Sequence, residues 1–106
     1  MVRRHAIPAC FHFHVVNAWN DDEQIWLDLP LYADAAVVDS LRLAPLRSGG
    51  TIAPSRLVRL RLPLAARSAE LIELVPQTLE LPRLHPAWMG QPHPVAYLSE
   101  SRAGQM

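Results

Sequence analysis

The sequence predicts an all-β protein built from short strands. Apolar residues alternate with a period of two in several segments, and clusters of turn-forming residues separate these segments. Little of the chain keeps the period of a helix, and its last part is rich in proline, which interrupts helices. Because half of the 106 residues are hydrophobic, the chain has the material for a packed core, and disorder is not expected.

The first predicted unit, residues 8–29, contains a strand, a polar loop at 20–23 and a return strand at 24–29. Bulky side chains on both faces of the return strand are typical of a sheet that is covered on both sides. With a period of two, residues 11–19 predict one apolar face and one face that carries two histidines. The apolar face would hold Phe11, Phe13, Val15 and Trp19, and the opposite face His12, His14 and Ala18.

The His12-x-His14 pattern is therefore a candidate metal site. Same-face neighbours on a strand lie about 7 Å apart, close enough for both imidazoles to reach one ion. The alternative interpretation is a pair of surface or hydrogen-bonded histidines without a metal, and the spacing by itself does not decide between the two.

The rest of the chain predicts a linker, a hairpin and a final loop and strand. Residues 30–54 have a weak pattern, with a short helical turn or strand at 34–41 and loop at 41–50. Residues 55–75 predict a strand hairpin whose first strand interleaves Arg56, Arg59 and Arg61 with apolar residues, which favours an exposed basic face over an anion site. Residues 76–98 predict a Glu/Pro-rich loop and a strand, and 99–106 a frayed tail.

Three segments carry motifs that recur together in one family. Residues 8–19 read Pro-Ala-Cys-Phe-His-Phe-His-Val-Val-Asn-Ala-Trp, residues 79–86 read Leu-Glu-Leu-Pro-Arg-Leu-His-Pro, and residues 55–62 read Ser-Arg-Leu-Val-Arg-Leu-Arg-Leu. In this order they resemble the Phe-x-Phe-His-x-x-Asn-Ala segment, the Glu-Phe-Pro-Arg-Ile-Asn-Pro segment and the Leu-x-Arg-x-x-Leu-Asp strand of the carotenoid cleavage oxygenases. Retinoid isomerase and lignostilbene dioxygenase relatives belong to the same family.

The resemblance implies a fold and a site. The fold would be about two blades of a seven-bladed β-propeller, an incomplete ring that covers residues 1–106. The family holds Fe(II) on the propeller axis with four histidines, of which the motif places one at His14. Glu80 matches the carboxylate that hydrogen-bonds the outer nitrogen of an iron-bound histidine, and His12 falls where the family varies. His5, His85 and His93 match no ligand motif and are expected at flexible surface positions.

The implied activity is the cleavage of conjugated carbon–carbon double bonds of carotenoid, apocarotenoid or stilbene-like substrates by dioxygen. With one matched ligand of four, the chain is expected to be an internal piece that is inactive alone. Its partners would be the remaining blades, in the same or in a separate chain, and an apolar polyene or stilbene-like substrate.

Two functions of other classes stay open from the residues themselves. One is a small β protein that binds a metal through His12 and His14, with His5 or another histidine, without turnover. The other is a non-catalytic module that completes the sheet of another protein by pairing along a strand edge.

Composition excludes several further classes. Ten arginines balance ten acidic residues, so no net charge attracts nucleic acid or an anionic membrane. No apolar stretch reaches the roughly 20 residues of a membrane span, and polar residues interrupt any signal peptide. The single cysteine, Cys10, is expected to be a small packed residue in a reducing, cytoplasmic setting.

Overall fold

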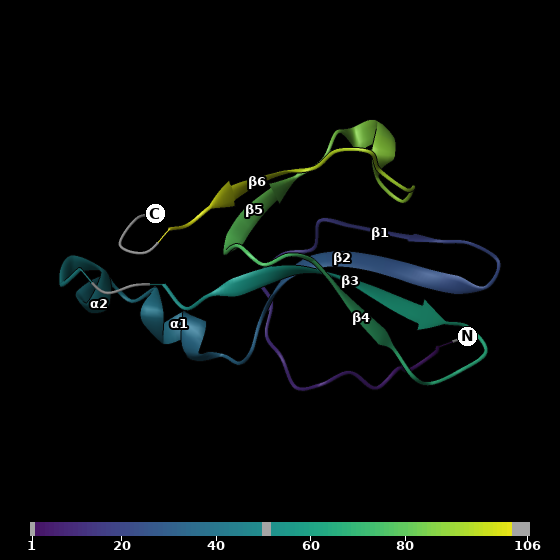
Figure 1. Cartoon of the computed structure of the whole chain (residues 1–106), viewed down its shortest axis with the longest axis horizontal. Helices are drawn as coiled ribbons and strands as arrows, with labels where there is room; N and C mark the ends of the chain where they lie inside the picture. Colours follow the sequence, from purple (N-terminus) through teal and green to yellow (C-terminus); the bar gives the residue numbers. More distant parts are fainter. Residues whose placement is uncertain (1, 50–51, 103–106) are drawn as a thin grey trace.

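Two antiparallel sheets form the framework of the computed structural model, which describes residues 2–49 and 52–102 (Figure 1). The larger sheet has the strand order β1-β2-β3-β4, and the smaller one pairs β5 with β6. The predicted all-β class is confirmed. The strands are β1 (Asn17–Asn20), β2 (Gln24–Tyr32), β3 (Ser55–Pro63), β4 (Glu70–Val75), β5 (Leu79–Arg83) and β6 (Tyr97–Glu100).

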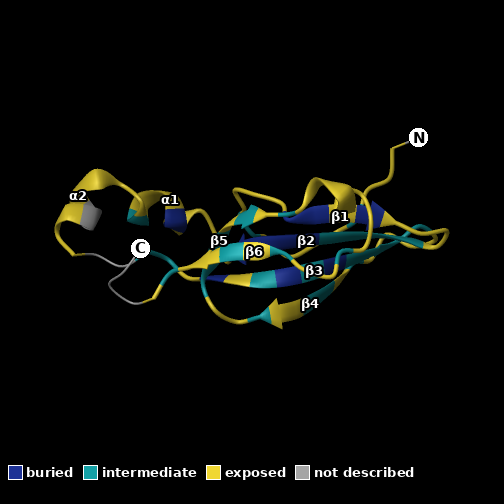
Figure 2. Ribbon diagram, turned by 90° about the horizontal axis from the view of Figure 1, so that it is seen from above, coloured by how far each residue is buried: buried dark blue, intermediate teal, exposed yellow. Residues whose placement is uncertain are grey.

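The central pair of strands, β2 and β3, divides the molecule into an apolar and a polar side. In their register Leu29 lies opposite Val58 and Leu27 opposite Leu60. The buried core cluster consists of Leu29, Leu31, Val58 and Leu60, with Cys10, Leu27, Leu62 and Leu71 packed against it. Figure 2 shows that the buried residues of the sheet concentrate in β1, β2 and β3, whereas β4 is more exposed. The opposite side of the pair faces the smaller sheet, to which Tyr32 of β2 and Ser55 of β3 are hydrogen-bonded.

The strand predicted at 11–19 is wrong for its first part, because regular pairing begins only at Asn17. Continued in the register that pairs Asn17 with Asp28, the chain would bring Phe13 opposite Tyr32. Instead Phe11 pairs with Tyr32, so this segment carries two extra residues. The alternation argument fails with it: Phe13 and Val15 are 40% and 44% exposed.

The return strand is longer than predicted and continues beyond Leu29 to Tyr32, into the predicted linker. It contains Pro30, which has no N–H to donate to a ladder. Pro30 pairs with Leu57 of β3 on one side. On the other side the ladder between β1 and β2 does not extend beyond the pair of Asn17 with Asp28. The proline is tolerated because that side of β2 carries no regular ladder at this point.

The linker also contains two short helices, α1 (Ala36–Ser40) and α2 (Leu43–Arg47), at the end of the molecule beyond β2 and β3 (Figure 1). For residues 34–41, the structure forms the helical one of the two predicted alternatives, with Val37 fully buried. The prediction of loop at 41–50 is wrong for 43–47.

The smaller sheet follows β4. A single 3-10 turn, η1 (Pro86–Trp88), lies in the connection between β5 and β6. Glu80 lies within strand β5 and not in a loop. The predicted frayed tail begins too early, because Ser99 and Glu100 pair with β5; residues 103–106 lie outside the described part.

The arginines of β3 do not form a free basic face, which corrects the prediction. Arg59 forms a bidentate pair with buried Asp28 at 2.8 and 2.9 Å. Arg61 pairs with Glu70 at 2.7 Å, and the more exposed Arg56 lies 3.9 Å from Glu73. Carboxylates of the neighbouring strands thus neutralise all three guanidiniums.

Among the described residues no helix is long and apolar enough to cross a membrane.

The pair of Arg59 with Asp28 yields a stability prediction. Asp28 is 2% exposed, so Arg59→Met leaves a buried carboxylate without its main partner and should lower the free energy of unfolding by about 3 kcal/mol. Arg56→Met is the matched control, because its ion pair is half exposed and should contribute less than about 1 kcal/mol. Urea unfolding of the three proteins measures both; equal losses would contradict the assignment.

Candidate metal centre

A contact between His14 and Glu80 is the centre of the site. His14 lies in the segment with two extra residues, ahead of β1, and Glu80 lies on β5 of the other sheet. Nδ1 of His14 is 3.0 Å from Oε2 of Glu80. With Nδ1 donating to the carboxylate, Nε2 keeps its lone pair and is available to a metal. The His14 side chain is 52% exposed and that of Glu80 is 19% exposed.

The Glu80 carboxylate has two further hydrogen bonds. The hydroxyl of Tyr32, at the end of β2, donates to Oε1 at 2.9 Å. The backbone N–H of Leu81 donates to Oε2 at 3.0 Å, and Leu81 has the left-handed φ of 54°, which is uncommon for a residue with a β-carbon. Both carboxylate oxygens are therefore held, and Oε2 is shared between Leu81 and His14.

Tyr32 is a site residue that the sequence analysis missed. Its side chain is buried, and both burial and the neighbouring Glu80 carboxylate raise the pKa of its phenol above the ordinary value, so the hydroxyl stays protonated and donates. Its cross-strand partner Ser55 accepts a hydrogen bond from the Leu79 N–H and donates one to the Leu79 carbonyl. Neighbouring residues of β2 and β3 thus hold neighbouring residues of β5.

Three other histidines, His5, His12 and His85, take no part in the contact between His14 and Glu80. His12 is exposed, and the strand face on which its pairing with His14 was predicted is not formed. His5 is partly buried with Nε2 2.7 Å from the Pro63 carbonyl, and His85 is exposed with Nδ1 accepting from the Ala87 N–H. Within residues 2–49 and 52–102 no three His, Cys, Asp or Glu side chains gather as a metal-binding group.

His93 is not at a flexible surface position, which corrects the prediction for this residue. Its side chain is 8% exposed and packs edge-on against Trp19, with ring centroids 5.5 Å apart. Nδ1 lies 3.0 Å from Nδ2 of Asn17, and Nε2 lies 3.5 Å from the Asp28 carboxylate. His93 therefore fastens the β5–β6 connection to β1 and β2.

Asn17 forms three hydrogen bonds to the backbone of this connection. Its Nδ2 donates to the carbonyls of Trp88 and Gln91 at 3.1 and 2.7 Å, and its Oδ1 accepts from the Gly90 N–H at 3.0 Å. Gly90 has a φ of 78°, a conformation that glycine adopts without strain. Asn17 lies only three residues after His14, so the same stretch that carries the imidazole also holds the sheet that carries Glu80.

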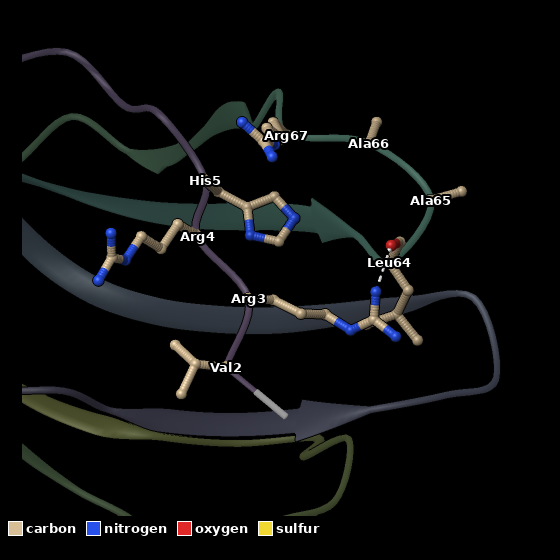
Figure 3. Close-up of a pocket in the computed structure, with 8 residues that line it drawn as sticks. All are labelled: Val2, Arg3, Arg4, His5, Leu64, Ala65, Ala66 and Arg67. Carbon is tan, nitrogen blue, oxygen red and sulfur yellow. Dashed lines mark hydrogen bonds between the residues drawn. The ribbon is translucent and has the colours of Figure 1, made fainter.

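An open cavity lies away from the His14–Glu80 contact. It has a volume of about 640 Å³ and lies between residues 2–5 and the turn 64–67 after β3 (Figure 3). The turn follows Pro63, which pairs with Gln24 at the other end of β2 from Tyr32. In Figure 3, Arg3 reaches the Leu64 carbonyl, whereas the side chain of Arg4 points away from the turn. The cavity adds nothing to the His14–Glu80 contact.

The donor set fits one position of an iron site. A neutral imidazole whose Nδ1 is held by a carboxylate is a common iron or zinc ligand, because the carboxylate fixes the tautomer and raises the basicity of Nε2. The described residues supply His14 in this form and a carboxylate already in place. They do not bring a second and third ligand to it.

Comparison with known proteins gives a consistent result. The sequence matches the family described as retinal pigment epithelial membrane protein over residues 1–106. Cobalt-substituted apocarotenoid oxygenase from Synechocystis is 26% identical with a TM-score of 0.77, over 97% of this chain and 22% of that protein. A chimera of that enzyme and RPE65 is 27% identical with a TM-score of 0.76, over 97% of this chain and 21% of the chimera. A comparison with curated protein sequences gives no significant match.

The chain thus spans about one fifth of the length of the solved structures that it matches. These are propeller-type carotenoid oxygenases, so the expectation of a partial propeller is confirmed, as is the resemblance to their family.

The role of Asn17 can be tested by substitution. Asn17→Ala removes the hydrogen bonds by which this buried side chain holds the β5–β6 connection, which should lower the free energy of unfolding by about 1–3 kcal/mol. Asn20→Ala, at the exposed end of the same strand, should change it by less than about 0.5 kcal/mol. Urea unfolding measures the stability, and amide exchange at Gly90 should accelerate only in Asn17→Ala. Unchanged exchange there would contradict the fastening role.

Proposed function

Because the chain belongs to the retinal pigment epithelial membrane protein family of carotenoid cleavage oxygenases, we propose that it forms part of a non-haem Fe(II) dioxygenase. The proposed reaction is the cleavage of a conjugated carbon–carbon double bond in a carotenoid, apocarotenoid or stilbene-like substrate by dioxygen. In this proposal His14 supplies one imidazole to the iron and Glu80 orients it.

The observation that supports these roles is the contact of 3.0 Å between Nδ1 of His14 and the Glu80 carboxylate. The two residues are 66 positions apart in the sequence and belong to different sheets. A histidine on the surface has no need of a carboxylate that two further donors hold in place, whereas a metal ligand does, because the fixed carboxylate defines the tautomer and the direction of Nε2.

Ferrous iron, when bound by neutral imidazoles, supplies open positions for dioxygen and the electrons for its activation. The residues of this chain would hold the metal through Nε2 of His14 and keep the proton on Nδ1 against Glu80. Beside them, the ring of Phe13 lies 6.4 Å from the His14 ring and is 40% exposed, which suits an apolar substrate.

The remaining ligands and the walls of the substrate cavity would come from other blades, in the same or in a separate chain. The larger sheet ends at β1 on one side and β4 on the other, and such edges pair readily with further strands. The proposed enzyme is therefore complete only when these blades are joined to residues 1–106.

The roles of the three side chains can be separated in an enzyme that has its full set of ligands. His14→Ala should abolish iron occupancy because a bond to the metal is lost, and Glu80→Gln should lower iron affinity by about 10- to 100-fold because only the orientation of the imidazole is lost. His12→Ala is the matched control and should change little. Metal analysis and oxygen uptake measure the effects, and equal losses for His12→Ala and His14→Ala would favour the paired-histidine site instead.

The 106-residue chain by itself should bind Fe(II) weakly and should not cleave an apocarotenoid or a stilbene, because one imidazole does not hold ferrous iron selectively. Anaerobic titration followed by an oxygen-consumption assay tests this expectation. Robust turnover by the purified chain would refute the requirement for further blades.

A further inference from the structure

We infer that Tyr32 is a positioning residue for the metal site: its hydroxyl holds the Glu80 carboxylate in the orientation that receives the proton on Nδ1 of His14. The inference rests on the proposed function of His14 and Glu80, but it concerns a residue that the sequence motifs do not point to. Among the described residues Tyr32 has no hydrogen bond to His14, and it acts through Glu80.

The two oxygens of the Glu80 carboxylate have different hydrogen-bond partners. Oε2 accepts from the Leu81 N–H at 3.0 Å and from His14 at 3.0 Å, whereas Oε1 accepts from Tyr32 at 2.9 Å. A carboxylate held at one oxygen only can turn about its last side-chain torsion, which is broad. The bond to Oε1 removes this freedom and so fixes the direction in which Oε2 meets the imidazole.

Tyr32 is itself held in place through both its backbone and its ring. It is 3% exposed, and its backbone N–H and carbonyl pair with the carbonyl and N–H of Phe11 at 2.8 and 3.0 Å. The ring of Phe13 stands edge-on to the Tyr32 ring, with centroids 5.7 Å apart. Phe11 and Phe13 flank His12 and lead directly to His14, so Tyr32 contacts the segment that carries the ligand as well as the carboxylate that orients it.

His14 depends on this arrangement more than a buried ligand would. Its side chain is 52% exposed, and among the described residues Glu80 is its only hydrogen-bond partner. A loosened carboxylate would therefore release the ring to either tautomer, whereas metal binding through Nε2 requires the proton on Nδ1.

The matched variants are Tyr32→Phe and Tyr97→Phe. Both remove one hydroxyl and keep the ring, but Tyr97 is 69% exposed and its hydroxyl has no hydrogen-bond partner in the part of the chain that the structure describes. Tyr32→Phe keeps the ring that packs against Phe13, so any effect of this variant comes from the loss of the hydroxyl.

The first experiment uses the metal-free chain and reads the tautomer of His14 from its ring ¹⁵N chemical shifts above pH 8, where an ordinary histidine is neutral. The native protein and Tyr97→Phe should show the Nδ1–H form. Tyr32→Phe and Glu80→Gln should show mixed tautomers with backbone amide shifts preserved elsewhere. An Nδ1–H form that persists in Tyr32→Phe would overturn the inference, whatever the metal does.

The second experiment measures Fe(II) affinity in the enzyme with its full set of ligands. Tyr32→Phe should lower the affinity by about 10-fold, and the double variant Tyr32→Phe/Glu80→Gln should bind no more weakly than Glu80→Gln alone, because both changes remove the same orientation. Additive losses would overturn the inference.

The two proposals fail in different ways. If His14→Ala abolishes metal binding and Tyr32→Phe does not weaken it, the positioning role is rejected and the proposed function stands. If His14→Ala leaves metal binding intact, the proposed function is rejected, and the tautomer in the metal-free chain alone decides the role of Tyr32.

Discussion

The register between β2 and β3 is the constraint on which the rest of the structure depends. It places the core residues Leu29, Leu31, Val58 and Leu60 on one side. On the other side it pairs Asp28 with Arg59 and Tyr32 with Ser55. The polar side meets the second sheet: Asp28 approaches His93, Ser55 holds Leu79, and Tyr32 holds Glu80. A shift of one residue would exchange the two sides, bury the charged pair in the core and separate Tyr32 from Glu80.

The two extra residues before β1 explain how the His14 side chain, which precedes the larger sheet's first strand, can reach Glu80 of the smaller sheet. Regular pairing stops at Asp28, two residues before Pro30, which has no N–H to donate, and beyond it one isolated bridge joins Phe11 to Tyr32. Between these points the segment is free of the ladder, and His14 contacts Glu80 of the other sheet. Such irregularities in strand pairing often redirect a side chain next to an active site.

The sequence was sufficient for the all-β class and for the alternation in β2 and β3, because period-two patterns report directly on buried faces. It was insufficient at residues 11–16, where Phe13 and Val15 keep the alternation although the pairing is interrupted by a proline on the partner strand. His14 and Glu80 were selected by resemblance to a family and not by spacing. Tyr32 could not be selected at all, because a tyrosine at the end of an apolar strand has the same pattern whether its hydroxyl is used or not. The contact depends on the position of β5, which no local pattern encodes.

Leu81 shows what the site requires of the backbone. A left-handed conformation costs a residue with a β-carbon about 1–2 kcal/mol, and here it is adopted at φ 54° by an exposed leucine that buries little in return. The conformation coincides with the irregular pairing between Glu80 and Arg83 and directs the Leu81 N–H to Oε2 of Glu80. With Tyr32 on the other oxygen, the carboxylate is constrained from the protein side before any metal binds. The strain at Leu81 is therefore best understood as part of the orientation of His14, since the packing of the strand gives no other reason for it.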